Sequence, residues 1–112
     1  MIIREERIED YTQTEHMTMR AFWNIHGPGC NEHLLVHKLR KSKDYLPDLS
    51  RVAEMDGKIV GAIFYSRSWI KNEKETHEVI TFGPLCVDPM YQSRHVGEAL
   101  LKETITLAKA AG

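Results

Sequence analysis

A turn near the end of the chain carries side chains and amides suited to holding an anion. The stretch "VDPMYQSRHVGEALL" predicts a strand, a turn and the start of a helix. The turn contains Gln92, Ser93, Arg94, His95 and Gly97, whereas a purely structural helix start needs only one capping residue. The first amides of a helix lack intrahelical partners and lie at the positive end of its dipole. Beside an arginine and a serine, they favour a ligand with several phosphate oxygens.

A structural interpretation of the same turn is also open. Ser93 would then only cap the helix, and Arg94 would be a solvated surface residue. The chain has neither a Walker loop nor a Gly-x-Gly-x-x-Gly fingerprint, so neither common nucleotide motif explains the turn. Local features alone do not decide between the two interpretations.

The elements around this turn predict an α+β, or mixed α/β, fold with the order β-α-α-β-β-β-α. Two helices, at residues 8–23 and from Asn31 onward, are separated by a Gly-Pro-Gly loop. Two β-rich runs joined by Asp56-Gly57 predict a tight hairpin. A strand at residues 77–87 and a helix at about residues 94–111 follow, with Gly112 as the C′ glycine. We expect a three-stranded antiparallel meander, extended by an N-terminal strand and covered by helices, rather than a doubly wound sheet.

Length and composition limit the possible classes of protein. We expect the 112 residues to form a single domain, residues 1–112, with 42% hydrophobic and 28% charged residues. A net charge of −1 favours neither nucleic acid nor an anionic membrane as partner. The longest apolar run, residues 59–65, is far shorter than the roughly 20 residues of a membrane span. No signal peptide is visible, and we expect a cytoplasmic protein in which Cys30 and Cys86 are reduced thiols.

Residues 85–101 resemble the acetyl-coenzyme A signature of the GCN5-related N-acetyltransferase (GNAT) family. In that family a strand ending in V-x-P-x-Y is followed by Gln/Arg-x-x-Gly-x-Gly/Ala and a helix. The stretch "DGKIVGAIFY" also resembles the central hairpin of the family, and the first strand with two helices resembles its acceptor-side region. The resemblance implies a GNAT-like acyl-CoA N-acyltransferase fold across the whole chain, although only the signature is a specific motif.

The resemblance implies a role for each matching position. The backbone around Cys86 would lie beside the pantetheine arm, as another strand would, and the amides from Gln92 to Gly97 would hold the pyrophosphate. Gly97 would allow the phosphates to approach the backbone closely. Acetyl-CoA is the implied co-substrate, with no metal. The implied cofactor-binding residues are Leu85, Cys86, Val87, Gln92, Ser93, Arg94, His95, Val96, Gly97, Glu98 and Ala99.

His95 departs from the pattern, since the family usually has its first glycine at this position. If the position needs a positive φ, a residue other than glycine costs on the order of 1 kcal/mol. A ring that entered the path of the phosphates would cost more, whereas a ring turned outward and protonated would add attraction. We expect weaker cofactor binding rather than none.

Acetyl transfer needs a neutral amine, a polarised thioester carbonyl and a protonated leaving thiolate. A backbone N–H of residues 85–87 could polarise the carbonyl, and Glu78 in the same strand is the candidate base. Glu32 and His33 are candidates for contacts with the acceptor. We expect Cys86 to be a core residue rather than a nucleophile, and Tyr91 to pack rather than to act as the acid.

Family domains usually continue past this helix with a strand, a helix and a closing pair of strands. The sequence ends at Gly112, so the resemblance implies a domain truncated after the signature helix. The strand at residues 79–87 would then be an exposed apolar edge, which tends to recruit another chain. We therefore expect a homodimer formed through this sheet edge or a neighbouring helix.

The leading functional prediction is an N-acetyltransferase that moves an acetyl group directly to an amine of a small molecule or peptide. A non-catalytic acyl-CoA-binding or regulatory remnant is the alternative. A metal-binding module is the third class, because His33 and His37 are four residues apart near Cys30, although no fourth ligand is evident.

One aromatic stretch also has two interpretations. Phe22, Trp23 and His26 lie around the end of the first helix, where they could line an acceptor pocket. Aromatic residues at a helix end are more often part of the core. The sequence does not identify the acceptor itself.

Overall fold

The computed structural model describes residues 1–23, 32–71, 73–92 and 94–111. Its element order confirms the predicted β-α-α-β-β-β-α arrangement, with two short 3-10 turns added. The elements are β1 (Ile2–Arg4), η1 (Ile8–Asp10), α1 (Tyr11–Phe22), α2 (Glu32–Leu39), β2 (Arg51–Met55), β3 (Lys58–Lys71), β4 (Thr76–Val87), η2 (Pro89–Tyr91) and α3 (Val96–Ala111).

The four strands form one antiparallel sheet in the order β1-β2-β3-β4. The turn between β2 and β3 has φ angles of 55° at Asp56 and 74° at Gly57, which confirms the predicted tight hairpin. Within the described residues β4 pairs only with β3, so its other side is an edge of the sheet.

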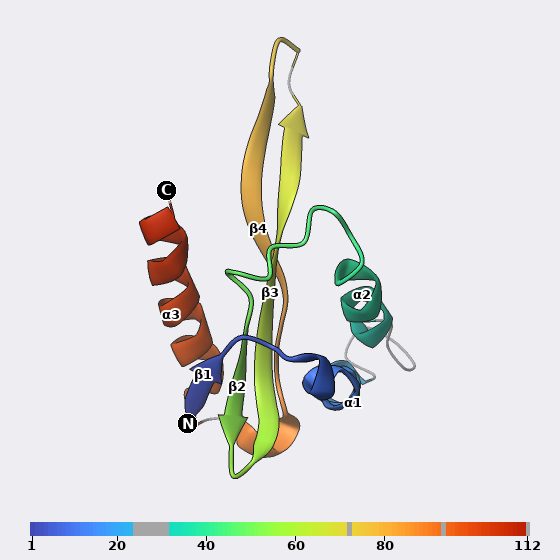
Figure 1. Ribbon diagram of the computed structural model, residues 1–112, viewed down its shortest axis with the longest axis vertical. Helices are drawn as coiled ribbons and strands as arrows, with labels where there is room; N and C mark the ends of the chain where they lie inside the picture. Colours follow the sequence, from blue (N-terminus) through green and yellow to red (C-terminus); the bar gives the residue numbers. More distant parts are fainter. Residues whose placement is uncertain (24–31, 72, 93, 112) are drawn as a thin grey trace.

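Helices cover both faces of the sheet, as Figure 1 shows. On one face, Met17 of α1 and Val36 of α2 pack with Phe64 and Cys86. On the other face, α3 packs against β3 and β2 through buried apolar side chains. Alternate residues of β3 therefore serve two different cores, as the twofold periodicity of a strand requires.

The hairpin of β3 and β4 extends well beyond these two cores (Figure 1). Along its distal part three large apolar side chains remain about half exposed, namely Trp69 (54%), Ile80 (49%) and Phe82 (50%). The predicted exposed apolar edge is thus present within the part of the chain that the structure describes.

The ends of the helices differ in detail from the predictions. α3 begins at Val96, two residues later than predicted, because His95 has a φ of 61° that an α-helix cannot contain. Arg40, which follows α2, is buried and bonds to Glu6 and Glu15 at 2.6 Å, so it joins α2 to α1. The Gly-Pro-Gly loop, the Asn31 cap, Cys30, His26, Ser93 and Gly112 lie outside the described residues.

None of the helices in the described ranges combines the length and apolar character that crossing a bilayer requires.

Candidate functional site

The start of α3 borders a surface hollow of about 250 Å³, called here the α3 hollow. Its lining residues come from the end of β4, from η2 and from the start of α3. The hollow therefore coincides with the turn that the sequence singled out for anion binding. Its lining residues are Val87, Tyr91, Gln92, His95, Val96, Gly97 and Glu98.

The first turn of α3, which borders this hollow, has backbone amides without a partner in the helix. The first helical hydrogen bond in this turn runs from the Ala99 amide to the His95 carbonyl at 3.0 Å. The amides of Val96, Gly97 and Glu98 precede it and have no acceptor within the helix. A Cβ placed on Gly97 would contact only the Val87 side chain, at an ordinary 3.5 Å. Protein packing thus does not require glycine here, whereas a ligand that approaches the backbone would.

His95 adopts a left-handed conformation, the case in which its departure from the glycine of the family pattern carries a backbone cost. Its φ of 61° is one that glycine takes freely and other residues take at a cost of roughly 1 kcal/mol. The side chain is 83% exposed, and its Nδ1 lies 3.2 Å from Glu98 Oε2. The ring is therefore turned along the helix towards Glu98.

Glu98 lines the α3 hollow, and the cations Arg94 and Lys102 lie near it in the sequence. Glu98 also contacts Lys102 Nζ at 2.9 Å, and the contacts of Lys102 and then His95 lower the pKa of the Glu98 carboxyl. The Arg94 guanidinium lies 5.3 Å from the centre of the Tyr91 ring, a distance typical of a cation–π contact. Tyr91 packs against the core as predicted, and its hydroxyl lies 3.4 Å from Asp56 Oδ2.

Asp88 stabilises the turn between β4 and α3 through its hydrogen bonds. Its carboxylate accepts hydrogen bonds from the Met90 amide at 3.0 Å and from Arg20 of α1 at 2.8 Å. Its own amide donates to the Val60 carbonyl at 2.7 Å. Burial alone would raise the pKa of Asp88, but the bonds from Arg20 and Met90 lower it below the ordinary value. The carboxylate stays ionised and fixes the turn from two directions.

The edge of β4 is open next to the hollow. Because the Asp88 amide bonds to Val60, the alternation of an antiparallel ladder turns the peptide groups of Cys86 towards β3 as well. Those of Leu85 and Val87 then face outward, away from the sheet. A ligand that pairs with this edge would meet Leu85 and Val87 rather than the backbone of Cys86.

The thiol of Cys86 is buried in the core between α1 and β3. It lies 3.4 Å from Thr18 Oγ1 and 3.8 Å from the Ala62 carbonyl, and burial raises its pKa to about 11. A thiol that is neutral and shielded is a poor nucleophile at neutral pH. These properties agree with the prediction of a core residue.

Glu78 lies far from the α3 hollow along the same strand. Seven residues separate it from Leu85, which corresponds to about 23 Å of extended chain. Its Oε1 lies 3.4 Å from Arg67 Nε, and both side chains are about half exposed. The structure thus adds no proximity argument for a base at Glu78, which remains a prediction from the sequence.

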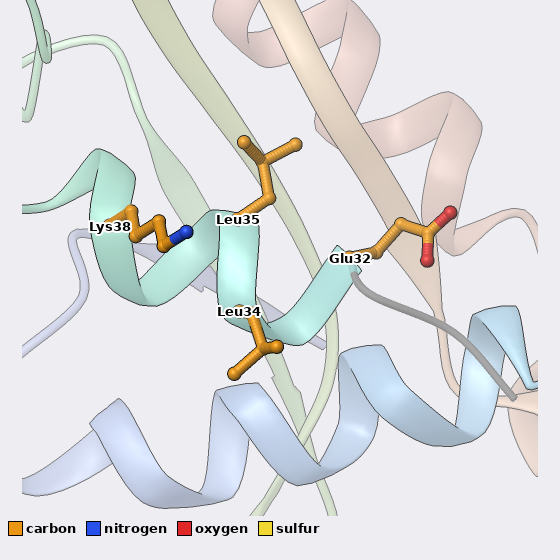
Figure 2. A pocket seen from close by; sticks show the side chains of 4 residues that line it. All are labelled: Glu32, Leu34, Leu35 and Lys38. Atoms are coloured by element: carbon orange, nitrogen blue, oxygen red, sulfur yellow. The ribbon is translucent and has the colours of Figure 1, made fainter.

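The acceptor-side candidates lie on α2, beside a pocket of about 490 Å³. Figure 2 shows Glu32 at the start of the helix, with Leu34, Leu35 and Lys38 along it. Both leucines are about half exposed, so the pocket has apolar walls with a carboxylate and an ammonium group. Of the two candidates, Glu32 lines this pocket; His33 is not among its lining residues.

The aromatic residues at the end of α1 separate into two roles. Phe22 packs against the core, whereas Trp23 is half exposed and lines a hollow of about 350 Å³ with Met19 and Arg20.

His37, one of the two histidines considered for a metal site, lies 3.3 Å from Glu15 Oε1. Among the described residues, no three His, Cys, Asp or Glu side chains are grouped to hold a metal ion.

Two residues of the site escaped the sequence analysis. Asp88 directly follows the predicted strand at residues 77–87, and an aspartate before proline is a common turn former. Arg20 gave no signal, because nothing in the spacing of residues 20 and 88 predicts their contact.

Comparison with known proteins adds independent evidence. Residues 5–112 match the family model described as acetyltransferase (GNAT) family. The uncharacterized N-acetyltransferase YjhQ of Escherichia coli K12 is 33% identical over 78 residues, which are 70% of this chain and 43% of that protein. The uncharacterized N-acetyltransferase MJ1207 of Methanocaldococcus jannaschii is 38% identical over 61 residues, which are 54% of this chain and 26% of that protein. The chain thus spans less than half the length of either relative.

Solved structures with the same fold include complexes. A GNAT family acetyltransferase from Brucella melitensis in complex with acetyl-CoA has a TM-score of 0.85 and 30% identity, covering 99% of this chain and 70% of that one. The acetyltransferase YhbS from Escherichia coli in complex with CoA has a TM-score of 0.79 and 24% identity, covering 99% and 57%.

Proposed function

The chain belongs to the acetyltransferase (GNAT) family, and from that premise we propose that it binds acetyl-CoA at the α3 hollow and transfers the acetyl group directly to an amine. The observation that carries the proposal is the coincidence of the hollow with the signature turn. All of its lining residues except Tyr91 are ones that the resemblance implied, and it borders the first turn of α3, whose amides have no acceptor within the helix.

Gly97 gives a physical test of whether the hollow fits a phosphate ligand. Glycine inside a helix costs about 1 kcal/mol relative to alanine, and the packing around Gly97 leaves room for a Cβ. The chain therefore keeps an unfavourable residue where its own structure does not need one. A pyrophosphate lying against the amides of residues 96–98 explains that choice.

The open edge of β4 supports a position for the rest of the cofactor. We propose that the outward peptide groups of Leu85 and Val87 bind the pantetheine amides, as a further strand would. The Leu85 N–H is then the donor placed to polarise the thioester carbonyl. Acetyl-CoA supplies the activated acyl group, and the protein holds it and excludes other orientations.

The acceptor is proposed to approach from the side of α2. Glu32 gives the pocket there a carboxylate that attracts an ammonium group, and Leu34 and Leu35 provide apolar contact. Substituting Glu32→Gln is expected to raise the KM for an amine substrate while the KM for acetyl-CoA stays unchanged. A cytoplasmic location and a role for Glu78 as base are kept as sequence-based proposals.

Calorimetric titration with acetyl-CoA tests the cofactor site directly. Pantetheine without phosphates is the matched control, because it keeps the strand-pairing amides and lacks the groups meant for the hollow. We expect saturable binding of acetyl-CoA and much weaker binding of pantetheine. Equal binding of both, or none at millimolar acetyl-CoA, would contradict the proposal.

A non-catalytic acyl-CoA-binding role is the second candidate. The observation in its favour is that the one candidate base, Glu78, lies about 23 Å along the strand from Leu85. Release of free thiol from acetyl-CoA across a panel of amines separates the two functions. Binding without amine-dependent thiol release would favour the non-catalytic role.

We also propose a homodimer formed through the distal part of β4. The edge there has unpaired peptide groups, and Ile80 and Phe82 are half exposed beside it. Edges of this kind pair readily with a second copy. Sedimentation velocity over a wide concentration range tests the proposal, and a monomer at the highest concentration would count against it.

A further inference from the structure

The α3 hollow contains a feature that works against its proposed ligand. Glu98, which lines the hollow, carries a carboxylate whose pKa is lowered, so it is ionised at neutral pH. A pyrophosphate held by the amides of the first helical turn would lie beside this negative charge. Like charges a few ångströms apart at a solvated surface repel each other appreciably.

The position of the carboxylate is set by two neighbours. His95 Nδ1 lies 3.2 Å from Glu98 Oε2, and Lys102 Nζ lies 2.9 Å from Glu98 Oε1. His95 also lines the hollow, whereas Lys102 lies one turn further along the helix and is not among the lining residues. The two contacts thus hold the carboxylate between a residue that lines the hollow and one that does not.

We propose that Glu98 weakens cofactor binding by electrostatic repulsion and so favours release of the phosphorylated ligand. The inference rests on the proposed acetyl-CoA site and deepens it. Glu98 contributes charge rather than contact, and His95 is its positioning residue. The CoA product carries the same phosphates as the acetylated cofactor, so the repulsion acts on its release as well.

Glu98→Gln tests the inference, with Glu103→Gln as the matched control. Both changes remove one negative charge from α3, but Glu103 is exposed and is not among the residues that line the hollow. We expect Glu98→Gln to tighten acetyl-CoA binding about three- to tenfold at low ionic strength and Glu103→Gln to leave it unchanged. The gain should shrink in high salt, where exposed charges are screened.

The melting temperature provides a readout that separates charge from structure. A carboxylate in the first turn of a helix stabilises it, so Glu98→Gln should lower the melting temperature slightly while affinity rises. General loosening of the fold would lower both the melting temperature and the affinity for acetyl-CoA.

Two results would overturn the inference. If the wild type binds acetyl-CoA and Glu98→Gln binds equally or more weakly, Glu98 does not repel the ligand and the proposed cofactor site still stands. If both glutamine variants gain equally, net charge rather than the position of Glu98 sets the affinity. Failure of every variant to bind acetyl-CoA would instead remove the proposed function together with the inference.

Discussion

Two glycines beside α3 show opposite reasons for lacking a side chain. Gly61 lies in β3 beneath the helix, and a Cβ there would come within 2.7 Å of Val96 Cγ1 and 3.0 Å of Leu100 Cδ1. Gly97 lies in the first turn of the helix, where a Cβ would contact Val87 at only 3.5 Å. The first glycine lets the helix approach the sheet, whereas the second leaves space that the chain itself does not fill.

The contrast separates a structural region from a functional one. The sheet-facing side of α3 is closed by Val96 and Leu100, both fully buried. The first turn of the same helix borders the α3 hollow. The packing at Gly61 therefore holds against the sheet the same helix whose first turn borders the hollow. Substitutions at the two glycines should affect different properties of the protein.

The largest effect is expected for Gly61→Val. The added carbons would overlap Val96 and Leu100 and approach the Cys86 carbonyl, to which a Cβ already comes within 3.3 Å. Overpacking of this severity costs about 3 kcal/mol or more of folding free energy. Urea unfolding followed by circular dichroism measures the loss. A variant that unfolds at the wild-type midpoint would show that α3 does not pack here.

Gly97→Ala should produce the reverse pattern. Alanine favours a helix over glycine by up to about 1 kcal/mol, and the site has room for it, so stability should stay equal or rise. Acetyl-CoA binding should weaken roughly tenfold or more, because loss of a charge-assisted hydrogen bond costs about 1.5–3 kcal/mol.

Parallel melting curves and calorimetric titrations of this variant test the comparison most directly. Wild-type affinity in Gly97→Ala would mean that the phosphates do not approach this turn. The proposed functional role of Gly97 would then be wrong, whereas the packing role of Gly61 would be unaffected.

The sequence predicted the elements of the two regions more successfully than the contacts between them. Turn residues such as Asp56 and Gly57 determine local geometry, and the alternation of apolar residues determines which face of a strand is buried. The signature turn is also a local pattern of residues, and the hollow lies beside it. Helix order and strand order were therefore predictable.

Contacts between distant residues were not predictable. The conflict between a Cβ at Gly61 and Val96 joins positions 35 residues apart, and Arg20 and Asp88 are 68 apart. The start of α3 was misplaced by two residues, because the sequence does not reveal that His95 has a positive φ.

Asp88→Asn extends the comparison to the turn before α3. The asparagine keeps the shape but lacks the charge that accepts from both Arg20 and the Met90 amide. We expect a loss of about 1–2 kcal/mol in stability and a several-fold weaker affinity for acetyl-CoA. Arg20→Gln should give a similar change, and the double variant should show less than the sum of the two.

The pH dependence of stability checks the same contact. The pKa of Asp88 is lowered in the folded protein, so its contribution is present above the ordinary aspartate value near 3.9 and is lost as pH falls through the lowered pKa. Unfolding midpoints measured from pH 6 down to pH 3 should fall less steeply in Asp88→Asn. The same decrease of the unfolding midpoint with pH in both proteins would mean that the contact with Arg20 does not stabilise ionised Asp88.

The smallest effect is expected for His95→Gly, which alters the turn without altering the packing of α3. Glycine adopts the φ of 61° without the cost of roughly 1 kcal/mol that histidine incurs, and its substitution frees Glu98 from one of its two contacts. The first change should raise stability, because the ligand-free protein already has this φ, and the second should tighten acetyl-CoA binding a few-fold. His95→Ala is the control, since it removes the ring and keeps the backbone cost. A gain in stability in glycine alone assigns that gain to the backbone, and a gain in affinity in both variants assigns it to the contact with Glu98. Unchanged or weaker binding in His95→Gly would show that histidine serves this turn as well as the usual glycine.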